Sequence, residues 1–215
     1  MSEFRVNSIT NQDGSAGPQV CGVSTFSGKS GVQIPSGPTD FRRQDGGGRG
    51  RGVMAGGAES LSSPYSISDR MQFIEIATRG NAVDFGDLSL ARYYVRGTAS
   101  STRGVFAGGT YPSPAVTNTI DFVTISSQGG ANDFGDMSIN RNGIAVFGNQ
   151  TRGVLSNGYT TPTNTQTNLI EFITIATTGD ANDFGNLSEK REINTGFASP
   201  TRGIIAGGAQ GATVT

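Results

Sequence analysis

Short apolar runs recur along the chain at a separation of about fifty residues. The clearest run places a phenylalanine and several other apolar residues around two polar positions, as in Ile120–Ile125, and it returns at Met71–Ile76 and Ile170–Ile175. Apolar residues occupy both faces of each run, which is typical of a strand covered on both sides. The pattern therefore predicts one β-strand per repeat, enclosed between the sheets of adjacent repeats.

The spacing of recurring residues separates rigid from variable parts of each repeat. The strand phenylalanine is followed after twelve residues by the phenylalanine of an Asp-Phe-Gly turn, after seven more by an arginine, and after eleven more by the arginine of a Thr-Arg-Gly motif. One inserted residue would reverse the faces of a strand, so fixed spacing predicts paired strands and tight turns. From the Thr-Arg-Gly arginine to the next strand phenylalanine the distance varies between 19 and 22 residues, which predicts a surface loop. The residues with fixed spacing are Phe73, Phe85, Arg92 and Arg103, then Phe122, Phe134, Arg141 and Arg152, then Phe172, Phe184, Arg191 and Arg202.

At least two further strands per repeat are expected. One begins at the first arginine of the pair and runs through Tyr93–Val95 or Ile144–Phe147. A short turn ending in Arg-Gly then leads into a strand that closes with a Gly-Gly doublet, as in Gly104–Gly109, and glycine in the turn indicates a hairpin. A strand end with so little side-chain bulk fits a place where strands crowd together near an axis.

This combination resembles the kelch repeat: a Gly-Gly doublet closing an apolar strand, a variable loop, a second apolar strand, and an arginine opening the next. The resemblance covers residues 47–215 and implies an all-β, β-propeller-type array of about three and a half repeats. It departs from the kelch pattern in two ways, because the chain has no tryptophan and the third doublet reads Asn157-Gly158. The phenylalanines of the Asp-Phe-Gly turns are expected to pack in the place of the tryptophan.

The sequences of Thr102–Gly109 and Ala131–Asp136 more closely resemble kelch-like repeats in structural proteins of tailed bacteriophages, especially cyanophages. Phe4–Pro18 and Gly31–Thr39 look like the attachment arm of such proteins. The resemblance implies an extended arm over residues 1–45 that docks on other virion proteins, and a repeat domain over residues 46–215. The candidate docking residues of the arm are Phe4, Val6, Ile9, Pro18, Val20 and Ile34.

Composition argues against most catalytic and binding chemistries. The chain has no histidine and one cysteine, which removes the commonest general base, the usual zinc ligand and a Cys-His nucleophile. A net charge of −1 gives no basic excess for nucleic acid, and no apolar run is long enough to span a bilayer. Asp121 and Glu171 recur at equivalent positions, which indicates a structural role, and Asp180 and Asp183 are expected to cap backbone amides rather than bind calcium. We therefore expect no cofactor and no enzymatic activity.

The variable loops are the most promising contact surface. Tyrosine beside short polar residues forms adaptable contacts, here for a host-surface glycan or protein, although plain solvated connections are the simpler alternative. The candidate residues are Tyr65, Tyr111, Tyr159, Thr163 and Asn164.

The repeat pattern breaks off at Thr213–Thr215, where another strand would begin, and an array ending there would expose an unpaired edge. Several chains could complete the array, the arm could supply a strand from Phe4–Ile9, or the natural product could continue, and we expect a homo-oligomer. The preferred function is a virion protein assembled in the host cytoplasm, as a tail fibre, decoration or adaptor component. The rivals are a cellular kelch-type interaction adaptor and, less favoured, a carbohydrate-active enzyme.

Overall fold

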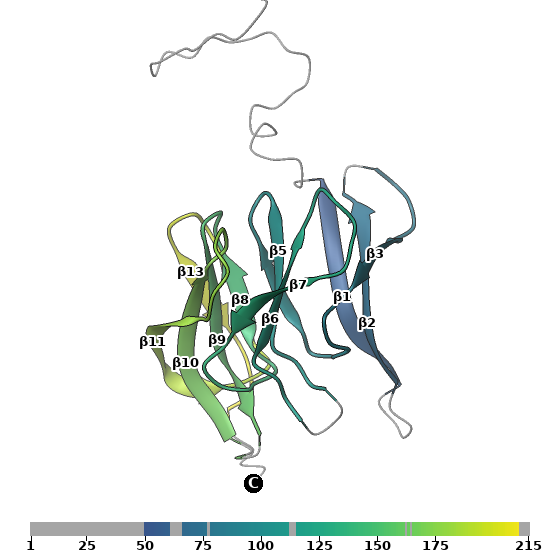
Figure 1. Cartoon of the computed structure of the whole chain (residues 1–215). Helices are drawn as coiled ribbons and strands as arrows, with labels where there is room; N and C mark the ends of the chain where they lie inside the picture. The colour runs from purple at the N-terminus through teal and green to yellow at the C-terminus, as the bar shows by residue number, and fades with distance from the viewer. Residues whose placement is uncertain are drawn as a thin grey trace, which may run out of the picture. The chain divides into compact units, whose positions relative to one another are not determined.

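The computed structural model describes residues 50–60, 66–76, 78–111, 115–161, 163 and 165–210, with the side chain of Glu59 excepted. These residues form thirteen β-strands and no helix, and all strand pairs are antiparallel (Figure 1). Contacts divide the chain into Met1–Thr39 and Asp40–Thr215, and all described residues belong to the second unit. The all-β prediction is confirmed, whereas the predicted arm and its six candidate residues lie outside the described residues.

Four sheets follow one another along the chain, and within each sheet the strands lie side by side in chain order. We number them sheets 1 to 4. Sheet 1 contains β1 (Arg51–Ser60), β2 (Ser66–Glu75) and β3 (Val83–Asp87). Sheet 2 contains β4 (Arg96–Ala99), β5 (Arg103–Ala107), β6 (Thr119–Thr124) and β7 (Asn132–Asp136). Sheet 3 contains β8 (Ala145–Gly148), β9 (Arg152–Thr160), β10 (Thr165–Thr174) and β11 (Asn182–Arg191), and sheet 4 contains β12 (Thr195–Ala198) and β13 (Gly203–Ala206).

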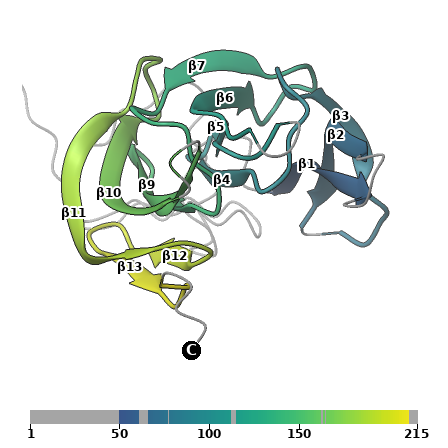
Figure 2. The same cartoon turned by 90° about the horizontal axis from the view of Figure 1, so that it is seen from below.

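The first strands of successive sheets lie together, and the last strands lie at the periphery. β8 contacts both β4 and β12, while β3, β7 and β11 are the outermost strands of sheets 1 to 3 (Figure 2). The sheets therefore stack face against face around a common inner edge. The strands of the described residues do not close this arrangement into a ring.

Two apolar clusters occupy the spaces between sheets. One joins sheets 1 and 2 and contains Phe85 and Val123, and the other joins sheets 2 and 3 and contains Ile120 and Ile173. β6 thus contributes Ile120 to one cluster and Val123 to the other, each no more than 2% exposed. This confirms that the phenylalanine strand is covered on both faces by neighbouring sheets.

The Asp-Phe-Gly segment, predicted to be a turn, lies in the last strand of each of sheets 1 to 3, which are β3, β7 and β11. Phe122 on β6 and Phe134 on β7 meet edge to face with ring centroids 6.0 Å apart, and the equivalent pairs in sheets 1 and 3 repeat this geometry at 5.9 and 6.1 Å. The strand was not predicted because its central glycine is typical of turns. The second phenylalanine of each repeat packs against the first, and its equivalence to the tryptophan of a kelch repeat stays a prediction.

The strand predicted to begin at each first arginine begins several residues later. β4 starts at Arg96 and β8 at Ala145, whereas Arg92 and Arg141 lie in buried connections between sheets. The second residue after each arginine has a positive φ, which is 58° at Tyr94, 59° at Gly143 and 53° at Ile193. This left-handed step reverses the chain and prevents a continuous strand.

Ile193 is the least suited of the three residues to this backbone conformation, because a β-branched side chain crowds the carbonyl at positive φ. The side chain is 62% exposed, so little apolar burial is lost on its removal. We expect Ile193→Gly to raise the free energy of unfolding by about 1 kcal/mol. Urea denaturation would measure it, and an unchanged or lower midpoint would contradict the left-handed turn.

Candidate functional site

Two buried ion pairs fasten the connections between sheets to the phenylalanine strands. Nη2 of Arg92 donates to Oδ2 of Asp121 on β6 at 3.0 Å, and neither side chain is exposed. Arg141 pairs with Glu171 on β10 in the same way. Burial lowers the pKa of both arginines, and the charge and hydrogen bond of each carboxylate oppose that shift. The Ser89 hydroxyl donates to the second oxygen of Asp121 at 2.7 Å, so the structural role predicted for the recurring acids is confirmed.

Two of the Arg-Gly arginines, Arg51 and Arg103, join a phenylalanine strand to the following sheet. The guanidinium of Arg103 lies 4.5 Å from the centroid of the Phe122 ring, within cation–π range. The same guanidinium donates to the carbonyl of Ile175 in sheet 3 at 3.1 Å. Arg51 stacks in the same way on Phe73 at 4.6 Å and donates to the next sheet. Arg51 and Arg103 therefore link their own sheet to the following one.

The acids around the Asp-Phe-Gly strands bind backbone amides. Oδ1 of Asp133 accepts from the Gly135 amide at 3.2 Å, and Oδ1 of Asp180 accepts from the Asp136 amide of the preceding sheet at 3.0 Å. The Asp183 carboxylate repeats the first contact in sheet 3. The capping role predicted for Asp180 and Asp183 is confirmed. No group of three acid or cysteine side chains with metal-binding geometry occurs within the described residues.

The Asp136 carboxyl at the end of β7 has a raised pKa. Partial burial, and then the charges of Asp133 and Asp180, raise the pKa of its carboxyl. A raised folded-state pKa means that stability falls as pH rises from the ordinary aspartate range through the raised value. Sheet 3 carries Asn186 at the equivalent position. We therefore expect Asp136→Asn to raise the melting temperature at pH 7. At pH 3 the Asp136 carboxyl is protonated in both the folded and the unfolded state, so the melting temperature should be unchanged there. The same stabilisation at both pH values would contradict a cost that arises from the ionised Asp136 carboxylate.

Three of the five candidate loop residues are described, and Tyr65 and Asn164 lie outside the described residues. Tyr111 is 41% exposed, and its backbone amide donates to the Ala115 carbonyl at 2.9 Å. The Thr163 hydroxyl lies 2.8 Å from that of Thr160, inside its own loop. Tyr159 is the last residue but one of β9, and its backbone pairs with that of Asn142.

Tyr159 borders a hollow of about 200 Å³, which we call the tyrosine hollow. Three successive connections between sheets and β9 build it. Its lining residues are Tyr94, Arg96, Asn142, Tyr159, Glu192 and Ile193. Two phenol rings beside amide, guanidinium and carboxylate groups can stack on a planar or sugar ring and hydrogen-bond its edges. Among the described residues, this is where the structure brings a predicted loop tyrosine together with further polar groups.

Tyr94 was not identified from the sequence as a contact residue, because the Tyr93–Val95 run was assigned to a strand. It is 48% exposed, and its ring lies beside that of Tyr93 with centroids 4.8 Å apart. A signal did exist: the tyrosine pair replaces Asn142-Gly143 of the next repeat at positions where the spacing is otherwise fixed.

No family model matches the sequence, and no curated protein matches it as a relative. Within the described part of the chain, no helix is long and apolar enough to cross a membrane.

Proposed function

We propose that the chain is a non-enzymatic structural protein of a tailed bacteriophage particle. In this proposal residues 1–45 dock on other virion proteins, and a kelch-like repeat module presents its loops, with the tyrosine hollow as the contact surface for a host-surface glycan or protein. The protein assembles in the host cytoplasm in several copies and acts as a fibre, decoration or adaptor component.

The stacking of the sheets supports the kelch-like, β-propeller-type part of the proposal. Sheets 2 and 3 each have four antiparallel strands with the first strand at the inner edge, and sheets 1 and 3 cover the two faces of sheet 2. A propeller blade has the same construction. The described sheets correspond to an open arc of such blades.

One observation carries the function. The side chains with fixed spacing are used in contacts within and between sheets, while the differences in length fall between the strand that begins at the Arg-Gly arginine and the phenylalanine strand, after Ser60, Ala107 and Thr160. A chain built this way is a rigid support on which loops can change without loss of the fold. The tyrosine hollow lies where those loops meet the connections, which favours presentation of a contact surface.

The bacteriophage assignment is supported by the sequence resemblance of the repeats and of residues 4–39. A cellular kelch-type adaptor is the second candidate. The mixed charge of the tyrosine hollow, with Arg96 and Glu192 in its lining, favours a polar peptide as ligand in that case.

Deletion of residues 1–40 tests the docking part of the proposal. We expect the full chain to co-purify with assembled particles at a fixed copy number by mass spectrometry, and the truncated chain to be lost from them while its strand signal in circular dichroism is retained. Retention of the truncated chain on particles, or absence of the full chain from them, would contradict the proposal. Tyr94→Ala with Tyr159→Ala separates the functions, because this variant should remain on particles and lose host attachment.

A further inference from the structure

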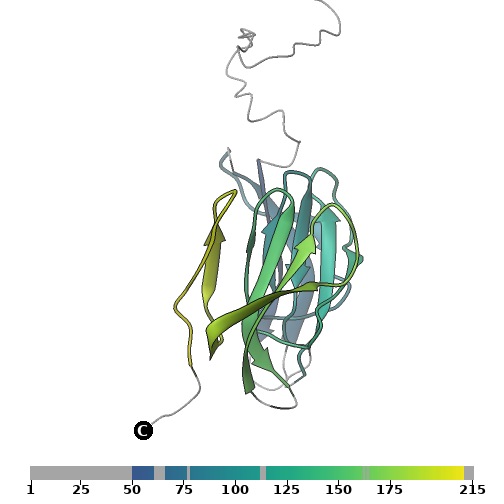
Figure 3. The ribbon, with the colours of Figure 1, turned by 90° about the vertical axis from the view of Figure 1, so that its left-hand side faces the viewer.

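The tyrosine hollow is built by segments that are far apart in the sequence, and all of its lining residues fall between β3 and β12. Each of the connections that lead into sheets 2, 3 and 4 contributes one or two side chains, and β4 and β9 contribute the others. The third connection leads into the hairpin of sheet 4, where β12 lies against β8 of sheet 3 (Figure 3). The stacking of the sheets therefore brings these side chains together.

We infer that the tyrosine hollow binds one neutral hexose residue of a glycan. The C–H face of the sugar ring lies on the tyrosine rings, and its hydroxyl groups bond to Arg96, Asn142 and Glu192. The inference rests on the proposed function, which makes the hollow a contact surface, and it selects a glycan over a protein as the ligand of that surface.

The residues of the hollow are not required by the repeat. Tyr94 lies two residues after the first arginine of its repeat, where the following repeats carry Gly143 and Ile193. Tyr159 follows the third doublet, and the preceding repeat carries Thr110 at that position. The repeats thus fold with very different side chains at these positions. Packing does not demand a tyrosine at either one, which leaves both rings available for a ligand.

The tyrosines supply the apolar part of the site. Tyr94 is 48% exposed, and its ring packs against that of Tyr93 with centroids 4.8 Å apart and planes tilted by 47°. An aromatic ring has a negative face, on which the C–H groups of a sugar ring can lie, and its phenol hydroxyl can bond to a sugar hydroxyl. Tyr159 places a second phenol in the same lining.

The charged groups of the hollow favour a neutral ligand. No ion pair joins Arg96 to Glu192 among the described residues, although both line the hollow. Nη1 of Arg96 donates to the Val95 carbonyl at 3.3 Å. Oε1 of Glu192 accepts from Nε2 of Gln166 at 3.0 Å, which orients the carboxylate. An anionic ligand would be repelled by Glu192 and a cationic ligand by Arg96, whereas a neutral ligand can contact both.

Size and hydrogen bonding select a single sugar ring. The hollow encloses about 200 Å³, below the roughly 300 Å³ at which pockets for drug-sized ligands begin. A hexose carries a hydroxyl group on most of its carbons, and each hydroxyl both donates and accepts. It can therefore accept from Arg96 and donate to Glu192 while its C–H groups lie on Tyr94. An aromatic side chain of a peptide brings only one or two polar atoms and cannot satisfy both charged groups as fully.

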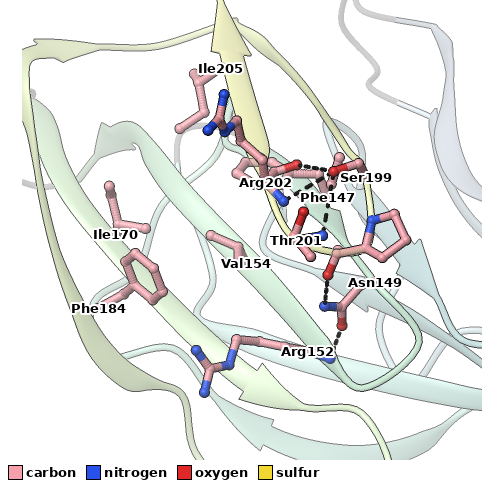
Figure 4. Close-up of a pocket in the computed structure, with 14 residues that line it drawn as sticks. Phe147, Asn149, Arg152, Val154, Ile170, Phe184, Ser199, Thr201, Arg202 and Ile205 are labelled. Atoms are coloured by element: carbon pink, nitrogen blue, oxygen red, sulfur yellow. Dashed lines mark hydrogen bonds between the residues drawn. The ribbon is translucent and has the colours of Figure 1, made fainter.

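The larger groove between sheets 3 and 4 differs in its chemistry. It encloses about 290 Å³, and the apolar side chains of Phe184 and Ile170 lie along one side of it (Figure 4). The side-chain amide of Asn149 accepts from the backbone amide of Arg152 and donates to the Pro200 carbonyl, each at 2.8 Å. This polar side chain is used to join two turns of the protein itself. We therefore place the sugar in the tyrosine hollow and not in this groove.

NMR titration of the full chain with the methyl glycosides of glucose, galactose and mannose tests the inference. We expect at least one glycoside to bind saturably, with a dissociation constant in the millimolar range. Tyr94→Ala and Glu192→Gln should each weaken binding about tenfold, because one removes the stacking face and the other a charged acceptor. Tyr111→Ala is the matched control: Tyr111 is 41% exposed and does not line the hollow, so binding should be unchanged. Unchanged circular dichroism would show that the variants fold.

Binding of none of the three glycosides would overturn the inference, as would an equal loss in Tyr111→Ala. Methyl glucuronide and methyl glucosaminide test the choice of a neutral ligand at about pH 6, where both are ionised. Tighter binding of either one than of every neutral glycoside would overturn that choice. A chain that stays on particles but binds no glycoside would refute the inference alone. A chain that binds a glycoside but is absent from particles would refute the bacteriophage proposal and leave the sugar site standing.

Discussion

Replacing Arg141 by methionine is expected to lower the free energy of unfolding by roughly 3–5 kcal/mol, because it leaves the buried Glu171 carboxylate without its cation. Glu171 is 1% exposed, and its other oxygen accepts the Ser138 amide at 2.9 Å, so water cannot replace the arginine without opening the interface. Urea denaturation of wild type and variant at pH 7 measures the loss.

The pH dependence of the Arg141→Met variant distinguishes an unpaired charge from a simple loss of packing. Without Arg141, burial favours the protonated form of Glu171, so its pKa rises and the folded state takes up a proton. The deficit of the variant should therefore shrink as pH falls. Arg191→Met is the matched control and should cost less than about 1 kcal/mol, because its ion pair is exposed. Equal losses in both variants, or a deficit independent of pH, would contradict the buried pair.

Gly135→Ala is the second change with a large expected effect. A Cβ at Gly135 would lie 2.5 Å from the backbone carbonyl group of Gly179 in the following sheet, at a φ of +139°. Gly185 has nearly the same backbone, with φ at +133°, but a Cβ there meets nothing within 4 Å. Both alanine variants share the conformational cost, so their difference isolates the clash between sheets.

We expect Gly135→Ala to lower stability by about 1–3 kcal/mol more than Gly185→Ala, the range typical of overpacking an interior. Thermal unfolding of the two variants under identical conditions measures the difference. Equal melting temperatures would mean that sheets 2 and 3 do not approach each other as described.

The sequence was sufficient to predict the features that depend on local pattern. The phenylalanine strands, the Arg-Gly hairpins and the all-β class follow from periodicity and spacing, and β2, β6 and β10 confirm them. Apolar residues on both faces of Ile120–Ile125 also predicted cover from two sides, which the two clusters confirm. These features need no knowledge of which sheet lies next to which.

Features that depend on contacts between sheets could not be predicted in the same way. Phe134 lies in a strand because β6 pairs with it and sheet 3 covers it, although its Asp-Phe-Gly sequence resembles a turn. Arg92 and Arg141 looked like the first residues of strands, but they lie in buried connections, and the backbone two residues after each is left-handed. Tyr94 itself lines the tyrosine hollow, so the wrong strand assignment left one of the two tyrosines of the candidate site unpredicted.

The central claim is that the sheets are one stacked unit, held together by bonds from one sheet to the next. Four loop amides test it most directly, because each bonds to a carbonyl of the preceding sheet at 2.7 to 2.9 Å. These are the amides of Gly129, Ala131, Gly179 and Ala181, which bond to the carbonyls of Phe85, Asp87, Phe134 and Asp136. Hydrogen exchange measured by NMR should show them protected as strongly as the amides of β6 inside sheet 2. Rapid exchange of all four, with β6 still protected, would show that the sheets fold separately and would contradict the account.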